Sequence, residues 1–385
     1  MQDFLFNTTR SIQFGNGALQ KLGDIVLATA KGPVFLITDS GMMKTGIISK
    51  AIDILNAAKI EFRLFADVEA DPPEQVIEAA TRLAHDGAVG CVIGLGGGSS
   101  LDVAKLVALL AGGQERLKDI YGVGKARGPR LPLILVPTTA GTGSEVTPIS
   151  IVTTGTAEKM GVVSPVLLPD VALLDPELTY GLPPQVTAAT GIDAMVHAIE
   201  AFASANANNN PISRGFALQA LKLIGSALLT AVKDGTNSAA RADMLLGSML
   251  AGQAFANSPV AAVHALAYPL GGHFHIPHGL SNALVLPHVL RFNAVTAHEL
   301  YVEPAVHAFP ALASLEGQAR VSAFCDALAQ LSVDCGLPHR LRDVGITKDW
   351  IPRLARDAMN QTRLLVNNPR PITEEDALSI YHAAY

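Results

Sequence analysis

The second half of this sequence carries a carboxylate and an imidazole at a spacing that could bind a metal ion. Asp193 and His197 stand four residues apart in a segment typical of a helix, so both side chains project from one face. On an otherwise apolar face such a pair is costly unless it is satisfied. A metal ligand role and a local hydrogen bond between the two residues would each satisfy it, and their spacing leaves both open.

Two further histidines, His264 and His278, lie in a segment that contains several helix-breaking residues. On one straight helix they would lie roughly 21 Å apart, which is too far for a shared ion. Pro269, the Gly271–Gly272 pair and Pro277 predict a break in that helix. The chain could then fold back and bring both imidazoles together.

Folded back in this way, the segment would complete a set of one carboxylate oxygen and three imidazole nitrogens, from Asp193, His197, His264 and His278. This set suits Fe²⁺ and also Zn²⁺, with one position left open for a substrate oxygen. His273 and His275 are competing ligands by sequence alone. Their place inside the breaking segment favours the rim of a substrate opening.

Two loops rich in glycine and small hydroxyl residues are candidates for binding phosphate. The runs GLGGGSSLDVAK at 94–105 and PTTAGTGSE at 137–145 each follow a short apolar run. Glycines let several backbone N–H groups point one way, and a helix start adds partial positive charge. Either loop alone could equally be a tight turn or a polar loop. Together they favour a dinucleotide site, because ligands gather at the carboxyl ends of parallel strands.

Asp39 directly follows another apolar run, at 34–38. A carboxylate there could accept hydrogen bonds from both ribose hydroxyls of an adenosine. It would repel a 2′-phosphate, which favours NAD over NADP. The alternative is that Asp39 only caps the turn that follows it.

The elements that would position these residues differ between the two halves of the chain. In the first half, short apolar runs at 34–38, 91–95 and 131–136 alternate with amphipathic stretches at 73–85 and 101–110. This alternation predicts βαβ units and a Rossmann-like α/β domain, with a parallel sheet covered on both faces. The second half instead holds Ala- and Leu-rich helical stretches, at 186–204, 212–232, 239–256, 318–331 and 373–383. The run Leu182-Pro183-Pro184 marks the boundary, so we expect a dinucleotide-binding domain at 1–182 and an all-α metal-binding and substrate domain at 183–385.

Composition excludes several other classes of protein. The net charge is −6 and no basic block occurs, which argues against a nucleic-acid partner. No run of about 18 uninterrupted apolar residues occurs, so no membrane partner is expected. Three scattered cysteines form no disulfide framework, and the first residues lack a leader pattern. We therefore expect a cytoplasmic protein.

Taken together, these motifs resemble those of the iron-containing (group III) alcohol dehydrogenases over essentially the whole chain. The resemblance rests on FGNG at 14–17, GGGSSLDVAK at 96–105, PTTAGTGSE at 137–145, Asp175-Pro176, D-x-x-x-H at 193–197 and H-x-x-x-Y-P-L-G…P-H-G at 264–279. It implies an N-terminal dinucleotide-binding α/β domain and a C-terminal helical domain. It also implies a homo-oligomer, a dimer or larger.

The resemblance further implies a role for individual residues. Asp193, His197, His264 and His278 would bind the metal. Gly97, Gly98 and Ser99 would hold the pyrophosphate, with Asp102 nearby, while Thr138, Thr139 and Thr142 would line the cofactor. Lys159 would reach its ribose, and Asp39 would select NAD.

Two positions depart from the family pattern. Tyr268 stands where many members carry His, and its ordinary pKa of about 10 makes it a poorer proton relay near neutral pH. Asp71 stands where Asn is common, which we interpret as a minor change in contacts on the adenosine side.

The expected function is hydride transfer between NAD(H) and a small alcohol, aldehyde or ketone, with Fe²⁺ or Zn²⁺ as Lewis acid. Three alternatives remain at this point. The first is a maleylacetate-reductase-like enzyme that acts on an acidic keto substrate, which His273 and His275 would favour. The second is a dehydroquinate-synthase-like lyase, and the third is a non-catalytic NAD-binding protein.

Overall fold

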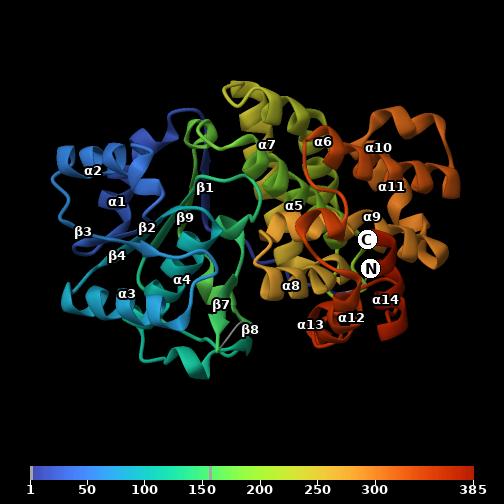
Figure 1. The fold of residues 1–385 in the computed structure, drawn as a ribbon. Coiled ribbons are helices and arrows are strands. Elements are labelled where there is room, and N and C mark those ends of the chain that lie inside the picture. The colour runs from blue at the N-terminus through green and yellow to red at the C-terminus, as the bar shows by residue number, and fades with distance from the viewer. Residues whose placement is uncertain (1–2, 156–157) are drawn as a thin grey trace. The chain divides into compact units, whose positions relative to one another are not determined.

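The computed structural model describes residues 3–155 and 158–385, and its helices and strands are labelled in Figure 1. The chain divides into two compact units. The sheet unit comprises Asn7–Thr139 and Gly143–Gly181. The helical unit comprises Leu182–Tyr385, together with Ala140–Thr142 and the N-terminal residues up to Phe6. The predicted fold class, an α/β region with a parallel sheet followed by an all-α region, is confirmed.

The sheet unit is built on six strands that all run parallel, in the order β1-β9-β6-β4-β2-β3. Their bounds are β1 Ser11–Phe14, β2 Val34–Asp39, β3 Phe62–Val68, β4 Cys91–Gly96, β6 Leu133–Pro137 and β9 Val171–Leu174. The three strands predicted from apolar runs are the central β2, β4 and β6. The edge strands β1 and β3 are only half-buried, so they lack the continuous apolar run that marks a strand covered on both faces.

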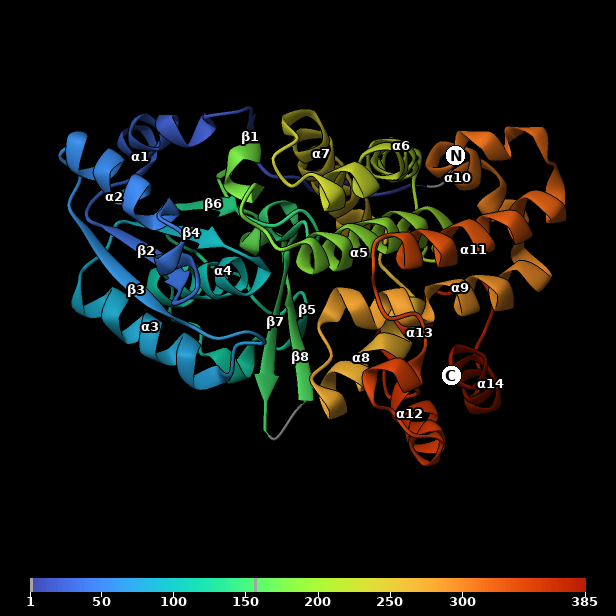
Figure 2. The ribbon, with the colours of Figure 1, turned by 45° about the horizontal axis from the view of Figure 1, so that its top comes forward.

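Helices cover both faces of this sheet, as Figures 1 and 2 show. Helices α3 (Glu74–Asp86) and α4 (Gly98–Gly112) share one core cluster, and α1 (Leu22–Thr29) and α2 (Ile47–Ala57) share the other. Strand β6 contributes to both, because alternate side chains point to opposite faces. Leu133 and Leu135 lie in the first cluster, and Ile134 and Val136 lie in the second.

A second, three-stranded sheet was not predicted from the sequence. It consists of the antiparallel pair β7 (Ile149–Thr154) and β8 (Glu158–Val163), with β5 (Gly122–Val123) parallel to β8. Its strands are short or half-exposed, so the sequence has no continuous apolar run that would predict them.

A buried lysine ties this small sheet to helix α4. Lys105 is fully buried, and its ammonium donates to Ser144 Oγ at 2.8 Å, Thr147 Oγ1 at 3.2 Å and the Ile149 carbonyl at 2.7 Å. Asp102 Oδ1 lies 3.3 Å from the same nitrogen. Burial lowers the pKa of Lys105, and the attraction of Asp102 opposes that shift. One charged side chain therefore holds the chain that follows β6 against α4.

The helical unit is organised around helix α5 (Pro184–Ala203), which is buried along most of its length. Helices α6 (Pro211–Lys233), α7 (Ser238–Asn257) and α9 (His278–Ala297) pack against α5, and α8 (Ala262–Phe274) packs against α9. The remaining helices are α10 Glu299–Ala308, α11 Gly317–Asp334, α12 Ile351–Ala358, α13 Thr362–Leu365 and α14 Glu374–Ala384. Ala is the most frequent residue of α5, and such small side chains let neighbouring backbones approach the helix closely.

The Asn-rich stretch at 205–210 forms the turn between helices α5 and α6. Asn209 Nδ2 donates to the carbonyls of Phe202 and Ser204 at 3.1 and 2.6 Å, which satisfies the end of α5. Asn210 Oδ1 accepts from the Ser213 N–H at 3.0 Å and caps the start of α6. Short amide side chains thus stop one helix and start the next.

Among the described residues, one helix is long and apolar enough to cross a membrane, namely α6. A helix in the core of a folded domain meets the same criterion. Helix α6 packs against α5, α7 and α10 within the helical unit.

Replacing Lys105 by Met should destabilise the protein by about 3 kcal/mol, the usual cost of removing one partner of a buried ion pair. Asp102, Thr147 and the Ile149 carbonyl would each lose a buried donor. Urea unfolding followed by circular dichroism measures the change. Lys50→Met, at an exposed lysine of helix α2, is the control and should change the stability by less than about 0.5 kcal/mol. Equal stabilities of the two variants would contradict the structural role of Lys105.

Candidate metal centre and cofactor-binding loops

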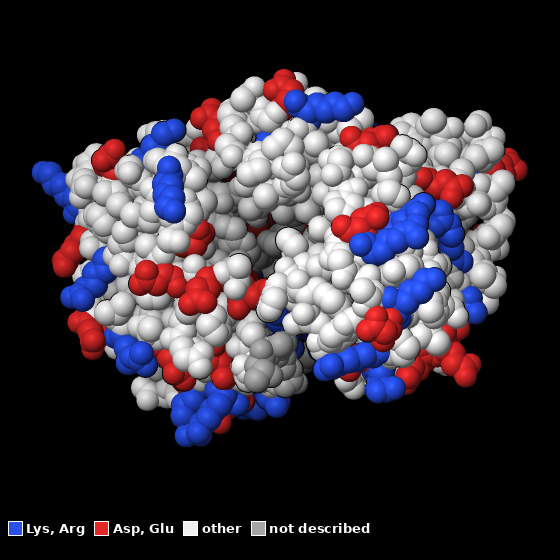
Figure 3. Space-filling view, viewed as in Figure 1, with Lys and Arg blue, Asp and Glu red and all other residues white. Residues whose placement is uncertain are grey.

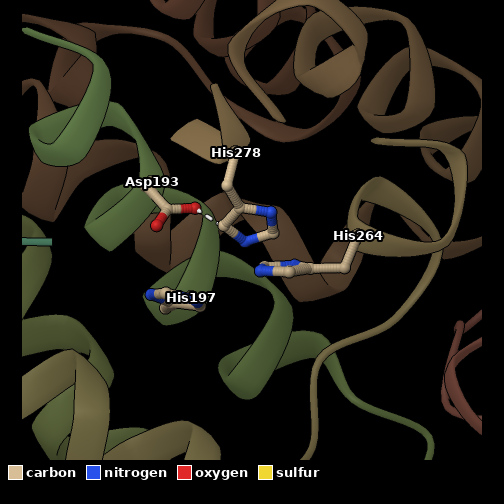
Figure 4. A group of neighbouring side chains, drawn as sticks. All are labelled: Asp193, His197, His264 and His278. Atoms are coloured by element: carbon tan, nitrogen blue, oxygen red, sulfur yellow. Dashed lines mark ion pairs between the residues drawn. The ribbon is translucent and has the colours of Figure 1, made fainter. Parts of the chain in front are cut away.

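Four side chains from three helices of the helical unit converge on one point, as Figure 4 shows. Asp193 and His197 come from α5, His264 comes from α8 and His278 is the first residue of α9. Each offers one ligand atom, and these atoms all lie within 4.8 Å of one another. Asp193, His197 and His264 are buried, whereas the His278 side chain is 43% exposed. The cluster is therefore open on its His278 side.

The two helices that carry His264 and His278 are separated by a sharp break. Helix α8 continues through Pro269 and the Gly271–Gly272 pair, so the prediction that these residues break the helix was wrong. The break falls at His275, whose φ of 54° is left-handed, and at Pro277, after which α9 begins. It still brings the rings of His264 and His278 to a centroid distance of 5.3 Å.

His197 is held in the neutral form that a metal ligand requires. Its Nδ1 lies 3.2 Å from the carbonyl of Gly141, which can only accept, so the ring proton lies on Nδ1 and leaves the Nε2 lone pair free. The ring stacks on Phe255 at 4.3 Å between centroids. Burial lowers the pKa of His197 to about 3, so the imidazole is uncharged at neutral pH.

Asp193 is a buried carboxylate that stays ionised. Burial works against its charge, but the neighbouring histidines and the hydrogen bond from Asn282 together outweigh burial and lower its pKa. Its Oδ1 also accepts from Asn282 Nδ2 at 2.6 Å. The cluster thus offers one carboxylate and three imidazoles, with ligand atoms that all lie within 4.8 Å of one another. This donor set fits a divalent cation such as Fe²⁺ or Zn²⁺.

Two polar residues beside the cluster, Asn282 and Glu200, were not predicted from the sequence. Asn282 Nδ2 lies 3.3 Å from Nε2 of both His264 and His278, and its buried Oδ1 has no hydrogen-bond partner among the described residues. Glu200 is buried and contacts His264. A signal for both was present in the helical spacing. Asn282 stands four residues after His278, and Glu200 stands three residues after His197 on a largely apolar helix.

The two histidines that lie between His264 and His278 in the sequence, His273 and His275, do not join the cluster. His273 Nε2 lies 2.7 Å from Asp357 Oδ2, and its ring packs against Trp350 at 5.4 Å. His275 ends α8 in its left-handed conformation. Tyr268, in contrast, lies beside the cluster, with its ring centroid 6.0 Å from that of His278.

The first glycine-rich loop has the predicted strand-to-helix form. Gly96 ends β4 with a positive φ of 154°, Gly97 is the N-cap of α4, and the helix starts at Gly98. None of the described side chains caps this helix start by a hydrogen bond. Ser99 lies in the first turn, and Thr139 lies next to Gly97. Glycines, an uncapped helix start and hydroxyl groups thus meet at the carboxyl ends of β4 and β6, as a phosphate site requires.

Asp39 lies at the carboxyl end of the neighbouring strand β2. Its Oδ1 accepts from the Met42 N–H at 3.0 Å, so the capping alternative is realised. Its Oδ2 accepts from Ser100 Oγ at 3.3 Å, which places the carboxylate beside the glycine-rich loop as well. The two roles considered from the sequence are therefore compatible.

The remaining predicted cofactor residues are placed as follows. Asp102 accepts from Ser144 Oγ at 2.6 Å and from the Ile151 N–H at 2.9 Å, so its carboxylate serves the fold of the sheet unit. Thr138 is buried, and Thr142 belongs to the three-residue segment within the helical unit.

The Lys159 ammonium pairs with Asp71 Oδ1 at 2.8 Å and donates to Thr153 Oγ1 at 2.9 Å. Asp71 adopts a left-handed φ of 54°, which Asp and Asn tolerate better than most residues. The charge of Asp71 thus has a consequence that an Asn would lack, an ion pair that holds Lys159 in place.

Comparison with known proteins agrees with this geometry. Residues 9–176 match the family described as iron-containing alcohol dehydrogenase, and residues 187–385 match the description Fe-containing alcohol dehydrogenase family, C-terminal. The chain is 41% identical over 375 residues to long-chain-alcohol dehydrogenase 1 of Geobacillus thermodenitrificans (strain NG80-2), covering 96% of this chain and 94% of that protein.

Two solved structures are similar over their whole length. A 1,3-propanediol oxidoreductase superposes with a TM-score of 0.95 at 34% identity, covering 100% of both chains. Sulfoacetaldehyde reductase from Bifidobacterium kashiwanohense, in complex with NAD⁺, gives a TM-score of 0.89 at 32% identity, covering 100% of this chain and 99% of the other.

The chain therefore belongs to the iron-containing alcohol dehydrogenase family, and the resemblance inferred from its motifs is confirmed. It is an oxidoreductase that interconverts alcohols and carbonyl compounds.

Gly279→Ala should weaken metal retention and destabilise the protein by about 1–3 kcal/mol, as overpacking usually does. A Cβ at Gly279 would lie 2.3 Å from the carbonyl oxygen of Ala189, so the start of α9, with His278, must move away from α5. Metal content after dialysis and urea unfolding measure the two effects. The control is Gly215→Ala in helix α6, where a Cβ meets nothing within 4 Å. It should be neutral or stabilising, and the same metal loss in both variants would contradict the steric argument.

Proposed function

We propose that this protein is an NAD(H)-dependent alcohol dehydrogenase whose divalent cation, Fe²⁺ or alternatively Zn²⁺, is held by Asp193, His197, His264 and His278. The observation that carries the proposal is the convergence of these four ligand atoms within 4.8 Å of one another. Each buried polar group costs free energy unless it is satisfied. Four such groups that converge in a helical core therefore indicate a shared ligand that satisfies them.

The proposed cofactor site lies in the sheet unit, at the carboxyl ends of β2, β4 and β6. Gly97, Gly98 and Ser99 would hold the pyrophosphate, and Asp39 would accept the ribose hydroxyls. The other residues proposed to line this cofactor or to position those that do are Asp102, Thr138, Thr139, Thr142 and Lys159. The NAD⁺ complex of the sulfoacetaldehyde reductase, a relative with 32% identity, supports NAD as the cofactor class.

When bound, the cation would act as a Lewis acid on an alcohol or carbonyl oxygen, and the nicotinamide would accept or deliver the hydride. The chain's own residues set the conditions for this chemistry. Gly141 keeps the His197 proton on Nδ1, and Asn282 orients the Asp193 carboxylate. Burial raises the pKa of Tyr268, and the positive charge of Arg363 offsets this only in part. Tyr268 therefore stays protonated near neutral pH and serves as a hydrogen-bond donor rather than as a base.

A second candidate, an aldehyde or ketone that carries an acid group, is favoured by Arg363. Its positive charge lies close enough to Tyr268 to lower the pKa of that hydroxyl, and the Tyr268 ring lies 6.0 Å from that of His278 between centroids. A fixed positive charge this near the cluster would attract a carboxylate or sulfonate on the substrate.

The remaining properties follow from the same assignment. We propose a dinucleotide-binding domain at 1–182, a metal-binding and substrate domain at 183–385, a cytoplasmic location and a homo-oligomer. Acidic and basic side chains are interspersed on the face in Figure 3, which favours a small-molecule partner over a nucleic acid or a membrane surface.

The test of the proposed function is a substrate panel with the Fe²⁺-loaded protein and NAD⁺ or NADH, followed by absorbance at 340 nm. The panel includes primary alcohols of increasing length, diols, their aldehydes, and matched aldehydes with and without an acid group. We expect turnover of at least one class, and His264→Ala should lose bound metal and activity together. No reaction across the panel, or an active variant without metal, would overturn the assignment.

Asp39→Gly should raise the kcat/KM ratio of NADP⁺ to NAD⁺ by about tenfold or more, equivalent to ~1.4 kcal/mol, because a negative charge no longer faces the 2′-phosphate. Steady-state kinetics with both cofactors measure the ratio. Asp39→Asn keeps an oxygen for the Met42 N–H and removes only the charge, so it should shift the ratio in the same direction. An unchanged ratio in both variants would remove Asp39 from the ribose.

A further inference from the structure

We infer that Glu200 is a positioning residue for the metal centre, which fixes the tautomer of His264 so that its Nε2 is free to bind the cation. This inference rests on the proposed function, since it concerns the same four ligands. Glu200 lies on α5, three residues after His197, and its side chain is 5% exposed.

Both oxygens of the Glu200 carboxylate are used by the start of helix α8. Oε1 accepts from the Val263 N–H at 2.6 Å, and Oε2 lies 2.7 Å from Nδ1 of His264. A carboxylate near neutral pH accepts hydrogen bonds but does not donate them, so the proton of the His264 ring must lie on Nδ1. The lone pair of Nε2 is then directed at the ligand cluster.

A second contact, with Asn282, is compatible with the same tautomer. Asn282 Nδ2 must be the amide nitrogen, because it lies 2.6 Å from the Asp193 carboxylate, which can only accept. The same nitrogen lies 3.3 Å from Nε2 of His264. Nε2 of His278 lies equally far from this nitrogen, so the second N–H of the amide can serve only one of the two rings. It can donate to His264 when that Nε2 carries no proton, which agrees with a proton on Nδ1.

Only a carboxylate satisfies both donors at the start of α8. An amide at position 200 has one oxygen and one NH₂ group, so one of the two contacts would become unfavourable. If its NH₂ faced Val263, two donors would meet in a buried site. If it faced His264, the ring proton would move to Nε2 and block the metal. Glu200 therefore restricts His264 to its ligand form and holds the backbone that carries it.

A carboxylate behind a ligating histidine also increases the basicity of that ligand, and removal of such partners usually costs 10- to 100-fold in metal affinity. We therefore expect Glu200→Gln to weaken Co²⁺ binding by about 10- to 100-fold in the full-length, metal-stripped protein. Co²⁺ serves as the probe, because its visible absorption reports both occupancy and ligand geometry. The spectrum of the loaded variant should differ from that of the loaded wild type.

The control is Asp175→Asn, which alters another buried carboxylate that accepts backbone N–H groups, from Gly17, Leu19 and Glu177, in the sheet unit. It should lower stability in urea and leave the Co²⁺ affinity and spectrum unchanged. Circular dichroism confirms that each variant is folded before titration.

A double-mutant cycle with His264→Ala separates positioning from general damage to the fold. His264→Ala leaves three ligands, whose residual weak Co²⁺ binding is titrated at high Co²⁺ concentration. If Glu200 acts through His264, Glu200→Gln should weaken this residual binding by less than twofold. A wild-type affinity and spectrum in Glu200→Gln, or an equal loss in both backgrounds, would overturn the inference and leave the proposed metal site standing. A wild-type protein that binds no Co²⁺ would overturn both.

Discussion

The central constraint in this protein is the burial of one carboxylate among three imidazoles. A buried charge is tolerated only when opposite charge or hydrogen bonds surround it closely. Asp193 meets this condition through the histidines and Asn282, which keep its pKa low despite burial. The helices that carry these side chains must therefore cross at one place, and the close approach of α9 to α5 at Gly279 makes the crossing possible.

The ligands are themselves held by a frame of hydrogen bonds that the ligand motif does not contain. The carbonyl of Gly141 fixes the proton of His197, and Glu200 contacts His264. These contacts determine which nitrogen of each ring is available, which decides whether an imidazole can bind a cation at all. The chemistry of the centre thus depends on backbone and side-chain acceptors as much as on the ligands.

In the sheet unit, too, hydrogen bonds and ion pairs hold the residues of the cofactor motifs in place. Its glycine-rich loop leaves the start of α4 open, and the chain beyond β6 is fastened to that helix by Lys105 and Asp102. Asp102 illustrates how a residue in a cofactor motif can serve the fold, since its oxygens are occupied by the chain that they hold in place. Lys159 is likewise fixed by Asp71, where a neutral amide would have left it without an ion pair.

The sequence by itself determined the elements with strong local signals: the buried strands β2, β4 and β6, the long Ala-rich helices, and the four candidate ligands with their donor chemistry. These depend on periodicity, composition and residue type, which are properties of the chain. Only the tertiary structure decided where helix α8 breaks, because Pro269 is accommodated within the helix and the turn is set by the left-handed His275. It also decided that Asn282 and Glu200 reach the ligands while His273 turns to Asp357. Such contacts join residues far apart in the chain, and their formation depends on how helices pack rather than on the residues next to them.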